Sequence, residues 1–353
     1  MNYKYNEPLV SVIISSYNHE KYIFDCLQGL FNQDYSNFEV IIRDDGSKDR
    51  TPGLIHEFIT DKNKTHNIPT SVEFGQNVGM MNSANLLLKK ANGYIIMFCA
   101  SDDEYLPGRI KKTVEAHKKY ADFDLIACNA QVVSENGELI RPSFYNINNE
   151  GINKNEDVLK FKDLTTKGAV SLALGGFGLS FKKSLIEPIG FQFPDKLLFE
   201  DGYLSFLAAI QNGALILKEP LIKYRRSVNS MSRVDTTLDR INVIKQERRF
   251  LQMFLSLEEA KLSYLKNNLP VNGIIQMNRK RAIRYIEQKI TIVRIKISIC
   301  DSKVELKNWV SLLFQILIGP KSRYPLQILI LGLRRKGIEN LLISEYKKRS
   351  LIL

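Results

Sequence analysis

The chain has 353 residues, of which 44% are hydrophobic and 25% are charged, with a formal net charge of +12. This composition is typical of a globular protein with one large or two smaller domains, and it excludes a wholly disordered chain. The charge is uneven, because residues 237–353 hold 23 Lys and Arg against 9 Asp and Glu, whereas residues 1–236 are close to neutral.

The basic C-terminal third predicts contact with something anionic, and a solvated helical face rich in lysine explains it equally well. The four cysteines include no CxxC pair, as expected of a reduced cytosolic protein. No apolar run with a cleavage site opens the chain, so we expect no secretory signal. The apolar stretches Trp309–Gly319 and Leu326–Leu333 are too short to span a bilayer. We therefore expect a soluble protein in the cytoplasm.

The first hundred residues alternate between strand and helix patterns. Apolar runs predict buried strands at residues 10–15, 38–42, 71–74 and 94–99, with helices at about 22–30, from Thr51 onward and at 80–90. Thr51 is the expected N-cap of its helix, with Pro52 at the first helical position. This alternation predicts a parallel sheet with helices on both faces, in which ligands bind beyond the carboxyl ends of the strands.

The second half of the N-terminal region continues the pattern. It predicts a helix from Leu106–Pro107 to about Tyr120, a strand at 124–133, a hairpin turn at 135–137, a helix opened by residues 199–202, and closing strands at 214–217 and 221–224. After about residue 237 the pattern is helical and basic. We predict a domain of residues 1–236 followed by a basic, mainly α-helical region of residues 237–353.

Two aspartate pairs follow strands of the predicted sheet. Asp44–Asp45 come after the second strand and Asp102–Asp103 after the fourth, so both pairs lie at the ligand-binding edge. Magnesium and manganese bind carboxylate and phosphate oxygens, so one or two aspartates at a strand end suffice to anchor such an ion. In the transfer of a sugar from a nucleotide diphosphate, the ion would neutralise the charge of the diphosphate that leaves. Each pair alone is more often a helix cap or a turn. The occurrence of these motifs together and in this order is stronger evidence for a functional site than either pair alone.

Three segments carry a resemblance to a known family. VSVIISSYNHEKYIFDCLQGLFNQDYSNFEVIIRDDGSKDRT, NVGMMNSANLLLKKANGYIIMFCASDDEYLPGRI and LLFEDGYLSFLAAI resemble, in this order, the opening, central and catalytic segments of family 2 glycosyltransferases. The resemblance covers roughly residues 8–232. It implies a GT-A fold, which is Rossmann-like and mostly parallel, a nucleotide-sugar donor, a divalent metal (Mn²⁺ or Mg²⁺) and inversion at the anomeric carbon. It places the donor on residues 1–105 and the acceptor on residues 106–236.

The resemblance also implies roles for individual residues. Ser15, Tyr17 and Asp45 would contact the nucleobase. Asp102 would lie near the ribose, and Asp103 would bind the metal directly. Asp201 would be the general base, with Glu200 beside it near the acceptor. Gly175 and Gly176 would form the loop that admits the acceptor, and Arg225 or Arg226 would contact the donor phosphates.

Two departures from the family pattern concern the phosphates. No arginine occurs between Phe74 and Tyr94, where family members often have one that helps to bind the pyrophosphate. Ser227 follows the Arg225–Arg226 pair, where a histidine is common. Both departures leave more of the leaving-group charge to the metal and to these two arginines.

Other functions fit less well. The chain has no P-loop and no GxGxxG after its first strand, and the loop there is not the glycine-rich loop of a sugar nucleotidyltransferase. A non-catalytic nucleotide-sugar-binding or scaffold protein of the same fold would not require the aspartates. The histidines show no ligand spacing, and the basic region has no nucleic-acid recognition pattern.

The basic C-terminal region has two open interpretations. Its apolar helix faces could lie on an anionic membrane, or they could pack on the catalytic domain or on a second subunit of a homo-oligomer. The membrane interpretation makes the acceptor a lipid-linked saccharide, as in the assembly of bacterial surface polysaccharides such as O-antigen or capsule. A uridine donor is expected from family frequency alone.

Overall fold

The structure, a computed structural model, describes residues 7–62, 64, 67–145, 158–161, 178–226, 240–268 and 273–300. By its internal contacts the chain divides into two compact units. The first contains residues 1–227 and 260–283, and the second contains residues 228–259 and 284–353. The first unit therefore includes a helical segment from the basic C-terminal region.

The first unit is built on one sheet of ten strands, with the order β3-β2-β1-β4-β9-β6-β10-β5. Strands β7 and β8 pair with β6 and β10 outside this order. The strands are β1 (Val10–Ser16), β2 (Phe38–Asp44), β3 (Thr70–Phe74), β4 (Ile95–Phe98), β5 (Glu104–Tyr105), β6 (Leu125–Val133), β7 (Leu139–Arg141), β8 (Val158–Phe161), β9 (Leu179–Lys182) and β10 (Ala214–Arg225).

Parallel pairing joins the four strands that the sequence predicts first. Strand β1 lies between β2 and β4, and β3 pairs with the outer edge of β2. Strands β6 and β10 are also parallel to each other, whereas β9 is antiparallel to both of its neighbours, β4 and β6. The sheet as a whole is therefore mixed. Its strands β1, β2, β3 and β4 are all parallel, which confirms the prediction for this part of the chain.

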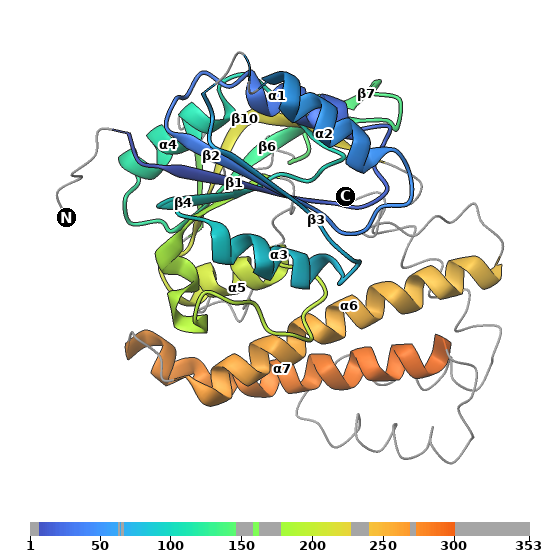
Figure 1. Cartoon of the computed structure of the whole chain (residues 1–353). Helices are drawn as coiled ribbons and strands as arrows, with labels where there is room; N and C mark the ends of the chain where they lie inside the picture. The colour runs from blue at the N-terminus through green and yellow to red at the C-terminus, as the bar shows by residue number, and fades with distance from the viewer. Residues whose placement is uncertain are drawn as a thin grey trace. The chain divides into compact units, whose positions relative to one another are not determined.

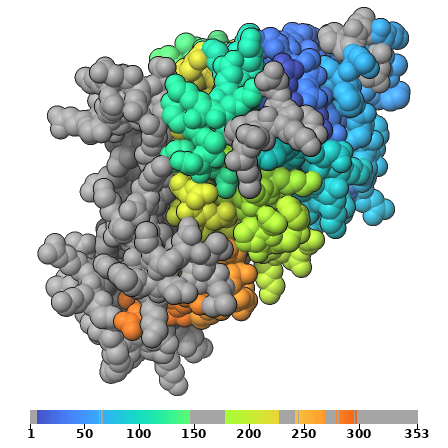
Figure 2. All heavy atoms as spheres, turned by 90° about the vertical axis from the view of Figure 1, so that its left-hand side faces the viewer, coloured from blue at the N-terminus to red at the C-terminus, as the bar shows by residue number. Residues whose placement is uncertain are grey.

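Helices cover both faces of this sheet (Figure 1). Helices α1 (Ile23–Phe31), α2 (Thr51–Lys62) and α4 (Arg109–Lys119) lie on one face, and α3 (Met80–Lys90) and α5 (Asp201–Ile210) lie on the other. The short 3₁₀ helix η2 (Lys183–Ile189) packs beside α5. Side chains of α4 and of η2 gather on the face shown in Figure 2.

Alternation along the strands explains the core. Val10, Val12 and Ile14 of β1 point to one face and join a buried apolar cluster with side chains of α1, α2 and α4. Between them, Ser11 and Ile13 point to the other face and are also buried. A strand buried on both faces gives a continuous apolar run, which is why the sequence pattern identified it.

Strand β10 differs from its prediction. The two strands expected at 214–217 and 221–224 form one strand, Ala214–Arg225, which pairs along its length with β6. Its register shifts between Leu217 and Ile222, around Pro220, which is typical of a bulge. Proline has no N–H to donate to the ladder and is tolerated inside a strand at a bulge.

The start of α2 also differs from its prediction. Thr51 is the first helical residue and not the N-cap. The carboxylate of Asp49 accepts the Thr51 N–H (3.0 Å) and the Thr51 hydroxyl (2.6 Å). The Thr51 Oγ1 in turn accepts the N–H of His19 (2.9 Å), which ties the loop after β1 to this helix.

The basic region forms two long helices where it is described, α6 (Arg240–Asn267) and α7 (Gly273–Cys300). Within the first unit, the Tyr264 ring of α6 packs edge-on against Phe206 of α5, with centroids 5.7 Å apart. Within the second unit, Arg294 of α7 pairs with Glu259 of α6 at 2.7 Å. No described helix is long and apolar enough to cross a bilayer. The stretches 309–319 and 326–333 lie outside the described residues.

Candidate active site

The loop after β1 carries the first predicted donor contacts. Tyr17 is 45% exposed, and Ser15 is half-buried at the end of the strand. Asn18 follows with a φ of 54°, a left-handed conformation that asparagine tolerates better than most residues. Its side chain accepts the Lys48 N–H (2.8 Å), and its own N–H donates to Ser47 Oγ (2.8 Å). The loop that presents Tyr17 is therefore fixed to the turn after β2.

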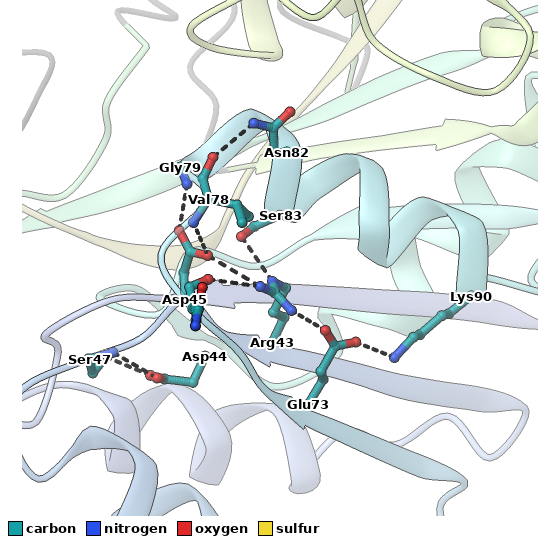
Figure 3. Close-up of polar contacts among 11 residues, drawn as sticks. Arg43, Asp44, Asp45, Ser47, Glu73, Val78, Gly79, Asn82, Ser83 and Lys90 are labelled. Carbon is teal, nitrogen blue, oxygen red and sulfur yellow. Dashed lines mark hydrogen bonds and ion pairs between the residues drawn. The ribbon is translucent and has the colours of Figure 1, made fainter.

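The turn after β2 contains the first aspartate pair, shown in Figure 3. Asp44 accepts the N–H (2.9 Å) and the hydroxyl (2.6 Å) of Ser47, which closes the turn. Asp45 is only 3% exposed, and its two carboxylate oxygens accept the N–H groups of Val78 and Gly79, both at 2.9 Å. Asp45 thus fastens the segment before α3 to the end of β2.

Arg43 forms the centre of this network, and the sequence analysis gave it no role. It is buried, and its guanidinium donates to Ser83 Oγ (3.2 Å), to the Gln76 carbonyl (3.0 Å) and to the carboxylate of Glu73 (Figure 3). Lys90 also pairs with Glu73 at 2.5 Å, and this ion pair lowers the pKa of Glu73. Although Arg43 lies beside α3, it is buried and bonded to the protein.

The second aspartate pair occupies the turn after β4, with the Asp103 N–H donating to the Ala100 carbonyl (3.0 Å). Asp103 is 2% exposed, and its Oδ1 accepts the Arg225 N–H (2.8 Å). Burial, and then the charge of Asp102, raise the pKa of Asp103 well above its usual range. Asp102 is half-buried, and no donor from the described residues reaches its carboxylate. We call residues Ala100–Asp103 the acidic turn.

Two buried thiols lie directly beneath the acidic turn. Cys26 of α1 and Cys99, which precedes the turn, have their sulfur atoms 3.6 Å apart, and Cys26 Sγ also contacts the Ala100 carbonyl at 3.6 Å. Both cysteines are free. The hydrogen bond to Cys99 and burial raise the pKa of Cys26 well above its usual range. Both side chains are buried, so this pair packs beneath the turn as a small apolar surface.

Arg225, at the end of β10, was predicted to contact phosphate. It is 5% exposed, and each of its guanidinium nitrogens has a protein partner: Nε donates to the Asp102 carbonyl (3.0 Å), Nη1 to the Glu135 carbonyl (3.0 Å) and Nη2 to the Asp25 carboxylate (3.3 Å). Arg226 is half-buried, and its N–H donates to the Val133 carbonyl (2.9 Å).

His19 is a second residue to which the sequence analysis gave no role. The hydroxyl of Ser101 donates to the Ser15 carbonyl (3.1 Å), and His19 Nδ1 lies 2.7 Å from the same hydroxyl oxygen. Because that hydroxyl has only one proton to donate, His19 Nδ1 is the donor to it. This chain of contacts connects the loop after β1 with the acidic turn. In the sequence, only the position of His19 in the loop after β1 could have indicated this role.

The acceptor side is partly described. Asp201 opens α5, and its Oδ1 accepts the Gly202 N–H (2.6 Å). Glu200 precedes it, and burial raises the pKa of Glu200. Both residues are half-buried. Gly175 and Gly176 lie outside the described residues.

The structure therefore brings together the loop after β1, both aspartate pairs and the end of β10. Among the described residues, no group of three or more His, Cys, Asp and Glu side chains is arranged to hold a metal ion. Two adjacent carboxylates with one raised pKa still offer the hard oxygen ligands that Mg²⁺ and Mn²⁺ prefer. Magnesium commonly uses one or two carboxylates and completes its shell with water and substrate phosphates.

Comparison with known proteins agrees with this arrangement. Residues 11–182 match the model of a family described as Glycosyl transferase family 2. The putative glycosyltransferase EpsH of Bacillus subtilis (strain 168) is 25% identical over 272 residues, covering 74% of this chain and 70% of that protein. The UDP-Glc:alpha-D-GlcNAc-diphosphoundecaprenol beta-1,3-glucosyltransferase WfgD of Escherichia coli is 26% identical over 271 residues, covering 74% of this chain and 93% of that protein.

Solved structures agree on the fold. The mannosyltransferase PcManGT from Pyrobaculum calidifontis, in complex with GDP-Man and Mn²⁺, superimposes with a TM-score of 0.53 at 15% identity, covering 98% of this chain and 89% of that one. At this identity the likeness concerns the fold alone. The family match and the enzymes among its relatives add the activity class. The chain is therefore a glycosyltransferase with the GT-A fold, and its residues 11–182 form a glycosyltransferase family 2 domain.

Proposed function

We propose that this glycosyltransferase transfers a sugar from a UDP-sugar to a hydroxyl group of a saccharide or lipid-linked saccharide, with inversion at the anomeric carbon. The observation that carries the proposal is the acidic turn, which places Asp102 and Asp103 at the carboxyl end of β4, where parallel sheets bind ligands. The name of the Escherichia coli relative specifies UDP-Glc and a GlcNAc-diphosphoundecaprenol acceptor, which supports both halves of the proposal.

The donor nucleoside would bind between the loop after β1 and the turn after β2. The exposed ring of Tyr17 offers a face for the base, and Ser15 lies at the strand end below it. Asp45 uses both carboxylate oxygens for backbone N–H groups, yet each oxygen retains a second lone pair that can accept an N–H of the base. Arg226 would contact the diphosphate of the donor.

A divalent cation, Mn²⁺ or Mg²⁺, fits the donor set of the acidic turn. Asp102 and Asp103 would hold it, and a cation beside the buried Asp103 would offset the burial and like-charge repulsion that raise its pKa. When bound there, the ion supplies neutralisation of the charge that develops on the departing diphosphate. The Mn²⁺ in the mannosyltransferase structure supports this assignment.

Asp201 would accept the proton of the acceptor hydroxyl. The hydroxyl oxygen then attacks the anomeric carbon on the face opposite the diphosphate, and the bond between that carbon and the diphosphate oxygen breaks, which inverts the configuration. Glu200, whose pKa is raised by burial, would lie beside Asp201 near the acceptor. Gly175 and Gly176 would border the acceptor on the same side.

The basic region would bring the enzyme to a lipid-linked acceptor. Residues 237–353 hold 23 Lys and Arg against 9 Asp and Glu, a charge that anionic lipid attracts. The protein would then be cytoplasmic and peripheral on the membrane, without contact to nucleic acid. Co-sedimentation with anionic and with neutral vesicles tests this part. Sedimentation velocity without lipid tests the alternative of a homo-oligomer.

The direct test is a panel of UDP- and GDP-sugars, each assayed for thermal stabilisation and for donor hydrolysis with and without Mn²⁺. A ligand that binds the folded state raises the apparent stability by mass action. We expect a Mn²⁺-dependent shift and slow hydrolysis with one UDP-sugar. Asp201→Asn should keep the shift and lose transfer, whereas Asp34→Asn, an exposed residue paired with Lys111, should change neither.

Stabilisation without any turnover would favour a non-catalytic nucleotide-sugar-binding protein. No stabilisation by any donor would contradict the proposal altogether. Thermal stabilisation by GDP-sugars alone would still support a glycosyltransferase, but it would show that the donor nucleotide is GDP and not UDP. Nuclear magnetic resonance of the product's anomeric proton decides between inversion and retention.

A further inference from the structure

Arg225 contacts the acidic turn through both its backbone and its side chain. Its backbone N–H donates to Asp103 Oδ1 (2.8 Å), and its Nε donates to the carbonyl of Asp102 (3.0 Å). A single residue thus holds both members of the aspartate pair, one through the carboxylate and the other through the peptide group. The two contacts approach the acidic turn from β10, which is more than a hundred residues away in sequence.

The rest of the guanidinium is anchored to two other elements. Nη1 donates to the Glu135 carbonyl in the β6–β7 hairpin, and Nη2 pairs with Asp25 of α1. The guanidinium also lies over the Tyr22 ring, with 5.1 Å between its central carbon and the ring centroid. The Tyr22 hydroxyl donates to the Glu135 carboxylate (2.9 Å), so the hairpin and α1 are also joined directly.

These contacts leave Arg225 poorly placed to bind substrate. The residue is 5% exposed, and every guanidinium nitrogen already donates to the protein. A diphosphate could approach the group only if some of these contacts were exchanged. A planar, permanently charged group with several donors in a fixed arrangement is suited to bridging three segments of chain at once.

We propose that Arg225 is a positioning residue: it holds the acidic turn in the conformation in which Asp102 and Asp103 bind the divalent cation, and it does not itself contact the donor diphosphate. This inference rests on the proposed function, because it concerns the cation site of that reaction. It replaces the phosphate role that the family resemblance implied for Arg225 and leaves Arg226 as the candidate for that role.

The first test titrates Mn²⁺ while UDP binding is measured by calorimetry, for the full chain and for Arg225→Met and Arg225→Lys. Residues that orient metal ligands typically change metal affinity by about 10- to 100-fold. We expect the Mn²⁺ concentration for half-maximal UDP binding to rise about 10-fold in both variants, because lysine cannot bridge three segments. UDP binding in EDTA should stay within about twofold of wild type.

A phosphate contact predicts the opposite pattern. UDP binding in EDTA would then weaken in Arg225→Met and recover in Arg225→Lys, which keeps the charge. That result would overturn the inference. If wild type itself binds UDP without any dependence on Mn²⁺, the metal part of the proposed function fails first, and the two failures are thereby distinguished.

Asp25→Asn gives a test with little risk to folding, because the Asp25 side chain is 52% exposed. If Arg225 positions the turn, loss of this ion pair loosens it, and the Mn²⁺ requirement should rise about twofold, a small effect as expected of an exposed partner. If Arg225 binds phosphate, the same substitution frees the guanidinium and UDP should bind more tightly. The two roles therefore predict changes of opposite sign.

The thiols beneath the acidic turn give a readout that needs neither metal nor substrate. Cys26 and Cys99 are buried under the turn, and Cys128 of β6 is buried as well. In Arg225→Met, peptide mapping after treatment with an uncharged alkylating reagent should show Cys26 and Cys99 modified about 5-fold faster, with Cys128 unchanged as the control for global unfolding. Equal rates in wild type and variant would contradict a positioning role.

Discussion

The two aspartate pairs of the site have the same side chains at the same edge of one sheet, yet the protein surrounds them differently. After β2, every carboxylate oxygen of Asp44 and Asp45 accepts a hydrogen bond, from Ser47 or from the N–H groups of Val78 and Gly79. After β4, the described donor to the pair is the Arg225 N–H on Asp103 Oδ1.

This difference separates a pair whose four carboxylate oxygens are all hydrogen-bonded within the protein from a pair with one described donor. A buried carboxylate with two backbone N–H donors is stable as an anion without any ligand. A buried carboxylate with one donor and a neighbouring negative charge has a raised pKa, as Asp103 does, and gains from a cation. The dipeptide alone does not decide which role it has, because the donors come from distant segments.

The largest expected effect is on catalysis at the second pair. Asp102→Asn should lower kcat/KM by about 10²- to 10³-fold, because it removes a charge placed where the cation and the leaving group would lie. The free energy of unfolding should change by less than about 1 kcal/mol, since the side chain is half-buried and no described donor reaches it. Steady-state kinetics and urea unfolding of the same preparation measure both quantities.

Asp34→Asn is the matched control, because it makes the same chemical change at an exposed ion pair with Lys111. It should leave both quantities within error of wild type. An Asp102→Asn enzyme that keeps more than a tenth of the wild-type kcat/KM would remove the distinction between the two pairs.

The next effect is on stability at the first pair. Asp45→Ala should lower the free energy of unfolding by about 3 kcal/mol, because it leaves the N–H groups of Val78 and Gly79 without their acceptor and removes a negative charge 3.6 Å from the buried Arg43 guanidinium. Urea denaturation monitored by circular dichroism measures this loss. A loss below about 1 kcal/mol would show that Asp45 is not a structural anchor.

The smallest expected effect is a change in the free energy of unfolding that has opposite signs at the two pairs. Asp103→Asn should raise the free energy of unfolding at pH 7 by about 1 kcal/mol in the absence of metal, whereas Asp45→Asn should lower it. The folded-state pKa of Asp103 is raised above its unfolded value of about 4, so wild-type stability falls as the pH rises from about 4 toward the folded-state pKa.

The Asp103→Asn variant lacks the titrating group and should lack that part of the pH dependence. Urea unfolding at several pH values between 4 and 8, in EDTA, compares the two proteins. A variant that is less stable than wild type at pH 7 and equally stable near pH 4 would reverse the assignment of Asp103 as an unfavourably buried charge.

Much of the fold could be predicted from the sequence because it depends on local patterns. The strands β1, β2 and β4 are apolar runs, and α3 was expected at the residues where it forms. Strand β9 was missed, since its four residues follow a glycine-rich stretch and give too short a pattern. Thr51 was a reasonable N-cap by residue type, but Asp49 lies nearby and accepts its N–H.

The site was harder to predict because its roles depend on long-range contacts. The sequence identified both aspartate pairs and their place at the sheet edge. It gave no indication that Arg43 contacts Glu73 and Ser83. Nor did it indicate that Arg225 contacts Asp25, which lies 200 residues earlier in the sequence. The family roles of Ser15, Tyr17, Asp201 and Arg226 stay predictions, because they require a bound donor or acceptor.

The bulge in β10 has an evolutionary consequence. The strand pairs with β6 on both sides of Pro220, but the register differs between the part before this residue and the part that ends in Arg225. A one-residue insertion or deletion near Pro220 would leave Ala214–Leu217 in place and turn Arg225 to the opposite face of the sheet. An insertion or deletion at this bulge would therefore remove the contacts between Arg225 and the acidic turn without any substitution in the site.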